Sequence, residues 1–247
     1  SSPFLLLRDT LQAPIFNNPN HLPLIEGNGL NPLLQNYWMT IHPPTLFLGF
    51  ASVTIPFCFA MTGLWEKDHT AWLKPVMPWT LFSTGILGLG ILMGGAWAYE
   101  ALSFGGYWAW DPVENMSLVP WIVLLAALHG NFIARHTGQS IKTTYIFYIL
   151  SFLLVVYSTF LTRSGILGEE SVHAFTEMGL EWQLVGFIFL FLLTGIYFLV
   201  TRNKSIPVVQ KEEQIQSREF WMFVSAMVLM FSAILITFST SIPVWNK

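Results

Sequence analysis

Charged residues are scarce in this sequence. They make up 10% of its 247 positions, whereas an ordinary soluble domain carries about a quarter. Hydrophobic residues make up 53%, so the composition excludes a typical soluble domain and predicts an integral membrane protein, with the lipid bilayer as a partner. The net charge of −3 comes without a basic cluster, and we therefore expect no nucleic-acid partner.

Cysteine is nearly absent as well. Cys58 is the only one, which excludes a disulfide within the chain, iron–sulfur ligation and C-x-x-C redox chemistry. The sequence also begins Ser-Ser-Pro, without an initiator methionine or a secretory signal. Because a multi-spanning protein needs insertion information, we expect the chain to be a section of a longer polypeptide.

Six apolar runs approach the length of about 20 residues that crosses a bilayer core. They cover residues 43–65, 76–98, 117–134, 143–161, 182–201 and 220–242. The third helix is expected to begin earlier, because Asp111, Pro112 and Glu114 have the pattern of an N-cap, a first-turn proline and an acid at the third position. Gly90 and Gly94 form a G-x-x-x-G pair that allows close helix contact. The sequence predicts an all-α, polytopic membrane helix bundle.

Lysine and arginine predict the orientation, because loops rich in these residues stay on the cytoplasmic side. Eight of the eleven lie in three loops: Lys67, Lys74, Arg135, Lys142, Arg202, Lys204, Lys211 and Arg218. The chain then divides into an outer segment (1–42), two transmembrane helices (43–98), an aromatic outer segment (99–121), three transmembrane helices (117–201) with an outer loop (162–181), a cytoplasmic loop (202–219), and a last transmembrane helix with an outer tail (220–247).

Aromatic residues are concentrated in residues 97–121, called the tryptophan-rich segment below. Seven of them occur there: Trp97, Tyr99, Phe104, Tyr107, Trp108, Trp110 and Trp121. Most aromatic belts at the membrane surface anchor the chain at the lipid headgroups. A dense cluster can also form a flat apolar surface for a large planar ligand. Gly105 and Gly106 allow a backbone or ligand to approach closely, and we favour the ligand-binding interpretation.

Two histidines are expected outside the membrane, close to its boundary. His42 precedes Pro43 and Pro44, which are tolerated in the first turn of a helix, and His173 lies in the outer loop 162–181. Neutral imidazole is a common ligand of haem iron, so the pair could supply both axial ligands. An interfacial histidine bonded to a loop carbonyl is the better explanation of His42 when this residue is considered alone.

His129 lies inside the third predicted span, where an ionisable side chain is unfavourable and usually functional. Its small neighbours Ala126, Ala127 and Gly130 leave room for a bulky group. The alternative is a neutral histidine hydrogen-bonded between helices. As a metal ligand it would need a second histidine, and none of the other five predicted spans contains one.

The remaining polar residues have simpler interpretations. Three histidines are interpreted as ordinary surface or loop residues: His21, His69 and His136. Asp111 and Glu114 are interpreted as a helix cap and not as an acid–base pair. Arg163 could pair bidentately with a haem propionate or anchor the chain at the interface.

The tryptophan-rich segment ends Trp-Ala-Trp-Asp-Pro-Val-Glu-Asn-Met-Ser-Leu-Val-Pro-Trp, and it resembles the WWD motif of the haem-handling proteins of cytochrome c maturation. Three further strings resemble one branch of that superfamily, the CcmF-type haem lyase subunit. They are Gly29-Leu-Asn-Pro-Leu-Leu-Gln35, Ile41-His-Pro-Pro44, and Thr162-Arg-Ser-Gly-Ile-Leu167 followed by Ser171-Val-His-Ala-Phe175.

The resemblance implies a function in cytochrome c biogenesis. Such a multi-pass protein of the cell inner membrane binds haem on the periplasmic face and promotes its thioether attachment to the C-x-x-C-H motif of apocytochrome c. Implied partners are apocytochrome c, a haem chaperone or donor, and other maturation subunits, and activity is expected only within a complex. The alternatives are a haem exporter or carrier without ligation, and a proton or ion transporter with His129 as a relay.

The resemblance also implies roles for individual residues. His42 and His173 would be the axial ligands of an outer haem b, and His129 one ligand of a separate b-type haem within the membrane, its partner lying in a later span beyond this chain. Haem contacts are implied for Trp97, Tyr107, Trp108, Trp110, Asp111, Trp121 and Arg163. No catalytic nucleophile is expected, because the chemistry would depend on positioning the substrates. The family usually has tryptophan at Phe104 and Tyr107, and its loop between Leu167 and Ser171 is shorter.

Overall fold

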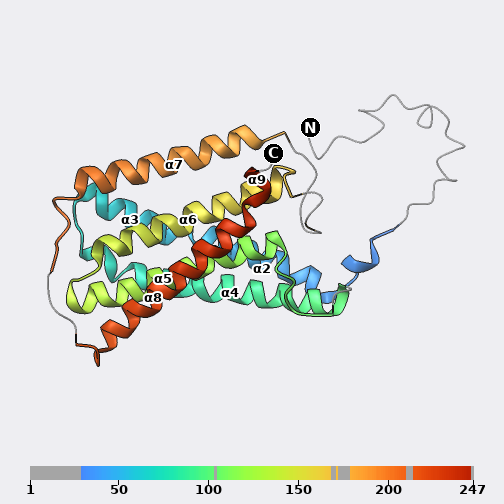
Figure 1. Cartoon of the computed structure of the whole chain (residues 1–247), viewed down its shortest axis with the longest axis horizontal. Coiled ribbons are helices and arrows are strands. Elements are labelled where there is room, and N and C mark those ends of the chain that lie inside the picture. Colours follow the sequence, from blue (N-terminus) through green and yellow to red (C-terminus); the bar gives the residue numbers. More distant parts are fainter. Residues whose placement is uncertain (1–28, 103–104, 168–170, 172–178, 210–213, 246–247) are drawn as a thin grey trace, which may run out of the picture. The chain divides into compact units, whose positions relative to one another are not determined.

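The computed structural model describes residues 29–102, 105–167, 171, 179–209 and 214–245. The predicted residues His21, Phe104 and His173 lie outside this set. Residues up to Asn36 form a unit of their own. It contains the short 3-10 helix η3 (Pro32–Leu34), which Asn31 caps by accepting a hydrogen bond from the Leu33 N–H. The second unit, Tyr37–Lys247, contains the helix bundle (Figure 1).

The described part of this second unit is built from helices, without a β-strand, which confirms the all-α prediction. Six candidate spans were found there: α2 (Tyr37–Ser52) with α3 (Thr54–Glu66), then α4 (Val76–Ala101), α5 (Pro112–Thr137), α6 (Ile141–Arg163), α7 (Glu181–Arg202) and α8 (Arg218–Thr240). The 3-10 helix η4 (Ala71–Leu73) precedes α4, and the single turn α9 (Ile242–Trp245) follows α8. The six spans correspond to the six predicted apolar runs.

The first span is interrupted once, at Val53, between α2 and α3. Pro56 follows three residues later and has no N–H to donate to the Ser52 carbonyl, so one helical hydrogen bond is missing there. At the interruption, the Val53 N–H bonds to the carbonyl of Phe50, three residues back, and not to the one four residues back as in a regular α-helix. The chain nevertheless continues as helix to Glu66, and the two helices together cross the bundle.

The start of this span differs from the expected one. The helix begins at Tyr37, so Pro43 and Pro44 lie inside α2 and not in its first turn. His42 is therefore a helical residue in the second turn. Hydropathy alone did not identify this start, because the residues from Tyr37 to Ile41 extend the helix beyond the strongly apolar run.

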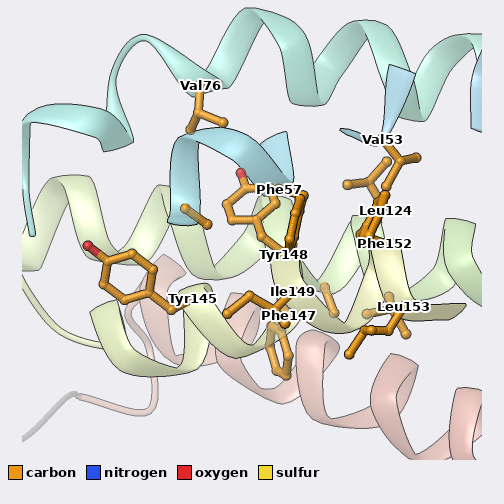
Figure 2. Close-up of a cluster of buried hydrophobic side chains, with 14 of the residues drawn as sticks. Val53, Phe57, Val76, Leu124, Tyr145, Phe147, Tyr148, Ile149, Phe152 and Leu153 are labelled. Atoms are coloured by element: carbon orange, nitrogen blue, oxygen red, sulfur yellow. The ribbon is translucent and has the colours of Figure 1, made fainter. Parts of the chain in front are cut away.

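The core of the bundle lies where α3, α5 and α6 meet (Figure 2). Phe57 of α3 stacks on Phe152 of α6, with ring centroids 4.2 Å apart. Tyr145 and Tyr148 of α6 are fully buried. Most of the apolar window of α5 (67%) and of α6 (72%) is buried, compared with 11% for α7 and α8. The two central helices are thus enclosed by the bundle, and α7 and α8 present apolar surface suited to lipid or further helices.

Glycines allow α2 and α4 to pack closely. A Cβ built on Gly90 would lie 2.7 Å from the Cα of Leu46, and one on Gly49 would lie 2.6 Å from the Cα of Leu87. Real Cβ atoms do not approach backbone atoms this closely, so only glycine fits at these two positions. The close helix contact predicted from the G-x-x-x-G pair is confirmed.

His69 is buried, and its interpretation as a surface residue was wrong. The side chain is 5% exposed. Its Nδ1 shares a hydrogen bond of 3.1 Å with the Tyr145 hydroxyl, and its Nε2 one of 2.9 Å with Ser205 Oγ. Burial lowers the pKa of His69 below its usual 6.5, while the neighbouring Asp68 carboxylate acts in the opposite direction. The charged neighbours in the sequence did not reveal that this loop folds over the ends of α6 and α7.

Candidate functional site

The tryptophan-rich segment ends in a helix cap at the start of α5. Asp111 Oδ1 accepts hydrogen bonds from the N–H groups of Val113 (2.9 Å) and Glu114 (3.4 Å). Glu114 Oε2 in turn accepts from the Asp111 N–H at 3.3 Å, which completes a capping box. The interpretation of this acidic pair as a cap is confirmed.

Trp110, the residue before this cap, has an unusual backbone conformation. Its φ of 58° lies in the left-handed region, which side chains larger than Asn or Asp seldom adopt. Asn115 Nδ2 donates to the Trp110 carbonyl at 3.0 Å and to Thr240 Oγ1 at 3.2 Å. The Trp110 side chain is 62% exposed, so this conformation presents the indole at the surface of the bundle.

Among the described aromatic side chains of the segment, Tyr99, Tyr107 and Trp110 are exposed. Tyr99 and Tyr107 are exposed and stack almost parallel, with centroids 4.4 Å apart and planes at 5°. Trp108 and Trp110 meet edge to face at 6.1 Å. Trp108 is half-buried, and its Nε1 is buried without a hydrogen-bond partner among the described residues. The segment therefore offers both flat aromatic surface and an indole N–H that has no acceptor in the described part of the chain.

Two of the predicted tryptophans belong to helix packing. Trp97 of α4 is only 6% exposed. Trp121 of α5 donates from Nε1 to the Thr84 carbonyl of α4 at 2.9 Å, and a Cβ on Gly88 would lie 2.8 Å from that nitrogen. Neither indole belongs to the exposed aromatic surface, because Trp97 is buried and Trp121 lies against Thr84 and Gly88 of α4. Direct haem contacts of these two residues stay predictions.

His42 is bonded to α4 through one ring nitrogen. Its Nδ1 lies 2.7 Å from the Gly90 carbonyl oxygen. A carbonyl only accepts, so Nδ1 carries the proton, and the lone pair of the ring is on Nε2, as a metal-ligating histidine requires. The ring also packs on Gly94, where a Cβ would lie 2.6 Å from His42 Cε1. The expected carbonyl partner thus belongs to a neighbouring helix and not to a loop.

The neighbouring glycine of α4 contacts the tryptophan-rich segment. A Cβ on Gly95 would lie 3.0 Å from the Tyr107 carbonyl oxygen. His42 and Tyr107 therefore meet α4 at consecutive residues, Gly94 and Gly95. The predicted imidazole and the backbone of Tyr107 consequently lie at the same level of the bundle.

The loop after α6 is attached to the cap of α5. Ser171 Oγ donates to Asp111 Oδ1 at 2.8 Å, and the Ser171 N–H bonds to the Leu167 carbonyl. Arg163 is the last residue of α6 and is half-buried. The loop that contains His173 in the sequence is thus tied to the tryptophan-rich segment at Ser171.

His129 lies in the part of α5 toward the opposite end of the bundle and is half-buried. Its Nδ1 donates to the Leu125 carbonyl of its own helix at 2.7 Å, which again puts the ring lone pair on Nε2. The expected space beside it is filled by protein, because Ala126 and Ala127 are part of the core. Gly130 packs on Thr144 of α6, whose Oγ1 would lie 2.8 Å from a Cβ there.

A pocket of about 470 Å³ lies next to Trp110. It is lined by Trp110, Pro112, Asn115, Ser239, Thr240, Ile242 and Pro243. Its walls come from the start of α5, the end of α8 and α9. The exposed face of the tryptophan-rich segment is therefore hollowed on the side of α8.

A family model described as cytochrome c assembly protein matches residues 14–167. The chain belongs to this family. It is similar to the cytochrome c-type biogenesis protein CycK of Bradyrhizobium diazoefficiens, with 46% identity over 154 residues, 62% of this chain and 23% of CycK. It is also similar to the cytochrome c-type biogenesis protein CcmF of Pseudomonas aeruginosa, with 34% identity over 244 residues, 98% of this chain and 37% of CcmF.

A solved structure named cytochrome c heme lyase CcmF matches this cytochrome c assembly protein with a TM-score of 0.67 and 31% identity. The match covers 85% of this chain and 32% of the solved one. The chain spans between 23% and 37% of the length of these relatives. It is a CcmF-type, multi-pass membrane protein, and the resemblance predicted from its four strings is confirmed.

Sequence reasoning missed several residues of this CcmF-type site. Asn115 and Ser171 lie within the strings that carry the resemblance, but their hydrogen bonds to Thr240 and Asp111 join positions 125 and 60 residues away. Trp38 Nε1 likewise donates to Glu100 Oε1 at 3.0 Å, joining the start of α2 to the end of α4. No local pattern predicts such pairs, because each depends on how the helices are arranged.

Proposed function

We propose that this chain is the part of a CcmF-type protein that binds haem at the periplasmic face of the cell inner membrane and promotes its attachment to apocytochrome c. The lysine and arginine bias supports the orientation. Haem b is the proposed substrate of the outer site. The proposed partners are apocytochrome c, a haem donor and other maturation subunits.

The contact of His42 and Tyr107 with consecutive residues of α4 carries the proposal. The Gly90 carbonyl fixes the His42 tautomer that has its lone pair on Nε2. The stacked, exposed rings of Tyr99 and Tyr107 supply the apolar surface that a porphyrin needs. An imidazole and a flat aromatic surface whose Tyr107 backbone lies at the same level of the bundle fit haem better than they fit a lipid anchor, which has no use for the imidazole.

The second axial ligand in the proposal is His173. This residue follows Ser171 by two positions, and two residues of chain span at most about 7 Å. Ser171 is bonded to Asp111, the residue after Trp110. The described anchor thus supports a position for the His173 loop beside the tryptophan-rich segment. Arg163 is the proposed partner of a haem propionate.

The proposed chemistry depends on holding the substrates together. Each S–H of the client's C-x-x-C-H motif adds across one vinyl C=C bond of haem, the sulfur to one carbon and the hydrogen to the other. The aromatic residues would hold the porphyrin plane, and His42 would hold the iron. Fixing the vinyl groups against two thiols raises their effective concentration, so the chain needs no nucleophile of its own.

A separate b-type haem is proposed at His129. The Leu125 carbonyl fixes the tautomer that has its lone pair on Nε2. The small neighbours no longer support this assignment, because the core and Thr144 occupy that space. The proposed second ligand belongs to another transmembrane segment of the full-length protein.

The experiment uses the full-length protein co-expressed with its maturation partners and a reporter c-type cytochrome. We expect the purified wild-type protein to show a haem spectrum, and His42→Ala to abolish covalent haem on the reporter. His136→Ala, at an exposed position, serves as the matched control. A wild-type protein without haem would point to an ion transporter, and retained haem export with no covalent product in any variant would point to a carrier.

A further inference from the structure

The left-handed backbone of Trp110 requires an explanation. Among the described residues only Lys67, Trp110 and Ser140 combine a positive φ with a side chain. Lys67 is the C-cap of α3, where such conformations are common, and Ser140 is a small residue in the turn before α6. Trp110 lies in the extended stretch before the α5 cap, and a bulky residue persists in this conformation only when its surroundings hold it there.

Two consecutive residues of α5 hold it. Glu114 Oε2 accepts from the Ala109 N–H at 2.9 Å and from the Asp111 N–H at 3.3 Å, which are the N–H groups of the residues before and after Trp110. Asn115 Nδ2 donates to the Trp110 carbonyl at 3.0 Å. A capping box requires only the bond to Asp111. The bonds at Ala109 and at the Trp110 carbonyl are additional, and together they fix the peptide groups around Trp110.

This attachment is rigid. Asn115 is 7% exposed, and its amide also donates to Thr240 Oγ1 at the end of α8. Glu114 is held by the same helix turn that Asp111 caps. The direction of the Cα–Cβ bond of Trp110 follows from its backbone conformation, so the three hydrogen bonds set the direction in which the side chain leaves the backbone.

We propose that Glu114 and Asn115 are positioning residues that hold the Trp110 indole against the planar ligand of the tryptophan-rich segment. This inference rests on the proposed haem function. It gives Glu114 of the capping box a second role beyond helix initiation. The Ala109 and Asp111 N–H groups bond to the same oxygen of Glu114, so the amide oxygen of a glutamine can accept both.

A double-mutant cycle tests this in the full-length, detergent-purified protein. Haem per protein is measured for wild type, Glu114→Ala, Trp110→Ala and the double variant, together with the circular dichroism of the Soret band. We expect Glu114→Ala to lower haem content by roughly threefold or more, within the coupling range of contacting residues. We expect Glu114→Gln to retain it, and Glu114→Ala to have no further effect once Trp110 is alanine.

Glu181→Ala is the matched control, because Glu181 is also the acidic residue in the first turn of a helix. Asn115→Ala repeats the cycle with the cap intact and decides the outcome if Glu114→Ala does not accumulate. Equal losses in the Trp110 and alanine-110 backgrounds, or no loss in either, would overturn the inference. A wild-type protein that carries no haem would instead overturn the proposed function, and this positioning role with it.

Discussion

Ser171 donates its hydroxyl hydrogen bond to Asp111 Oδ1 at 2.8 Å. The same oxygen accepts the N–H groups of Val113 and Glu114. One carboxylate therefore starts α5 and ties down the loop that follows α6. This connects the two outer segments that the proposed haem site needs.

We predict that Ser171→Ala lowers covalent haem attachment severalfold without lowering the amount of protein in the membrane. Asp111 keeps its bonds to the helix start while its bond to the loop is lost, and a hydrogen bond to a charged group contributes about 1.5–3 kcal/mol. Ser171→Thr keeps the hydroxyl and should retain function. Haem staining of a reporter cytochrome checks this, and full activity of Ser171→Ala would argue against a role for the tie.

A second prediction concerns Gly94. In Gly94→Ala the new Cβ would lie 2.6 Å from His42 Cε1, so the imidazole must leave its present position and haem content should fall. Gly85→Ala, in the same helix, is the matched control because nothing lies within 4 Å of a Cβ there. Both changes gain about 0.5–1 kcal/mol of helix propensity, so the difference between them isolates the contact. Equal haem spectra would show that His42 tolerates displacement.

Local patterns predicted the elements of this fold well. Hydropathy identified the six spans, because a helix needs about 20 mostly apolar residues to cross the bilayer core. The Asp-Pro-Val-Glu string at residues 111–114 predicted the cap, since the hydrogen bonds of the capping box itself lie within one helix turn. The Gly90 and Gly94 pair predicted a close helix contact.

Burial and partner choice were not predictable in the same way. His69 lies among charged residues in the sequence, but its partners Tyr145 and Ser205 are 76 and 136 positions away. Small residues beside His129 suit a ligand or a neighbouring helix equally, and Thr144 of α6 lies against one of them. Trp121 lies in the aromatic-rich segment of the sequence, but its side chain packs on α4. Each outcome depends on tertiary contacts.

A third prediction concerns the proposed b-type haem. In the full-length protein His129→Ala should remove a reducible haem from the spectrum, because the ring that has its lone pair on Nε2 is lost. His136→Ala, seven residues further along α5 and exposed, is the matched control. Reduced-minus-oxidised difference spectra provide the measurement. An unchanged spectrum in His129→Ala would identify this histidine as structural.

The last prediction is a pH dependence of stability centred on His69. Burial lowers the pKa of this imidazole, and the Asp68 carboxylate offsets part of the effect. In the pH range between the lowered pKa and about 6.5, the unfolded chain binds more protons than the folded one. The contribution of neutral His69 to the free energy of unfolding is therefore fully present above pH 6.5. It falls as the pH is lowered through that range, and it levels off once His69 is also protonated in the folded protein.

Thermal unfolding of the detergent-solubilised protein between pH 5 and pH 8 measures this. We expect His69→Gln to flatten the decline, and to lower the unfolding temperature at pH 8 because the bonds to Tyr145 and Ser205 are disturbed. Asp68→Asn removes the opposing charge but keeps the oxygen that accepts the N–H groups of Thr70 and Ala71. It should therefore extend the decline to lower pH. If wild type and His69→Gln lose stability in parallel as the pH falls, another group controls the acid sensitivity. The fold then tolerates protonation of His69.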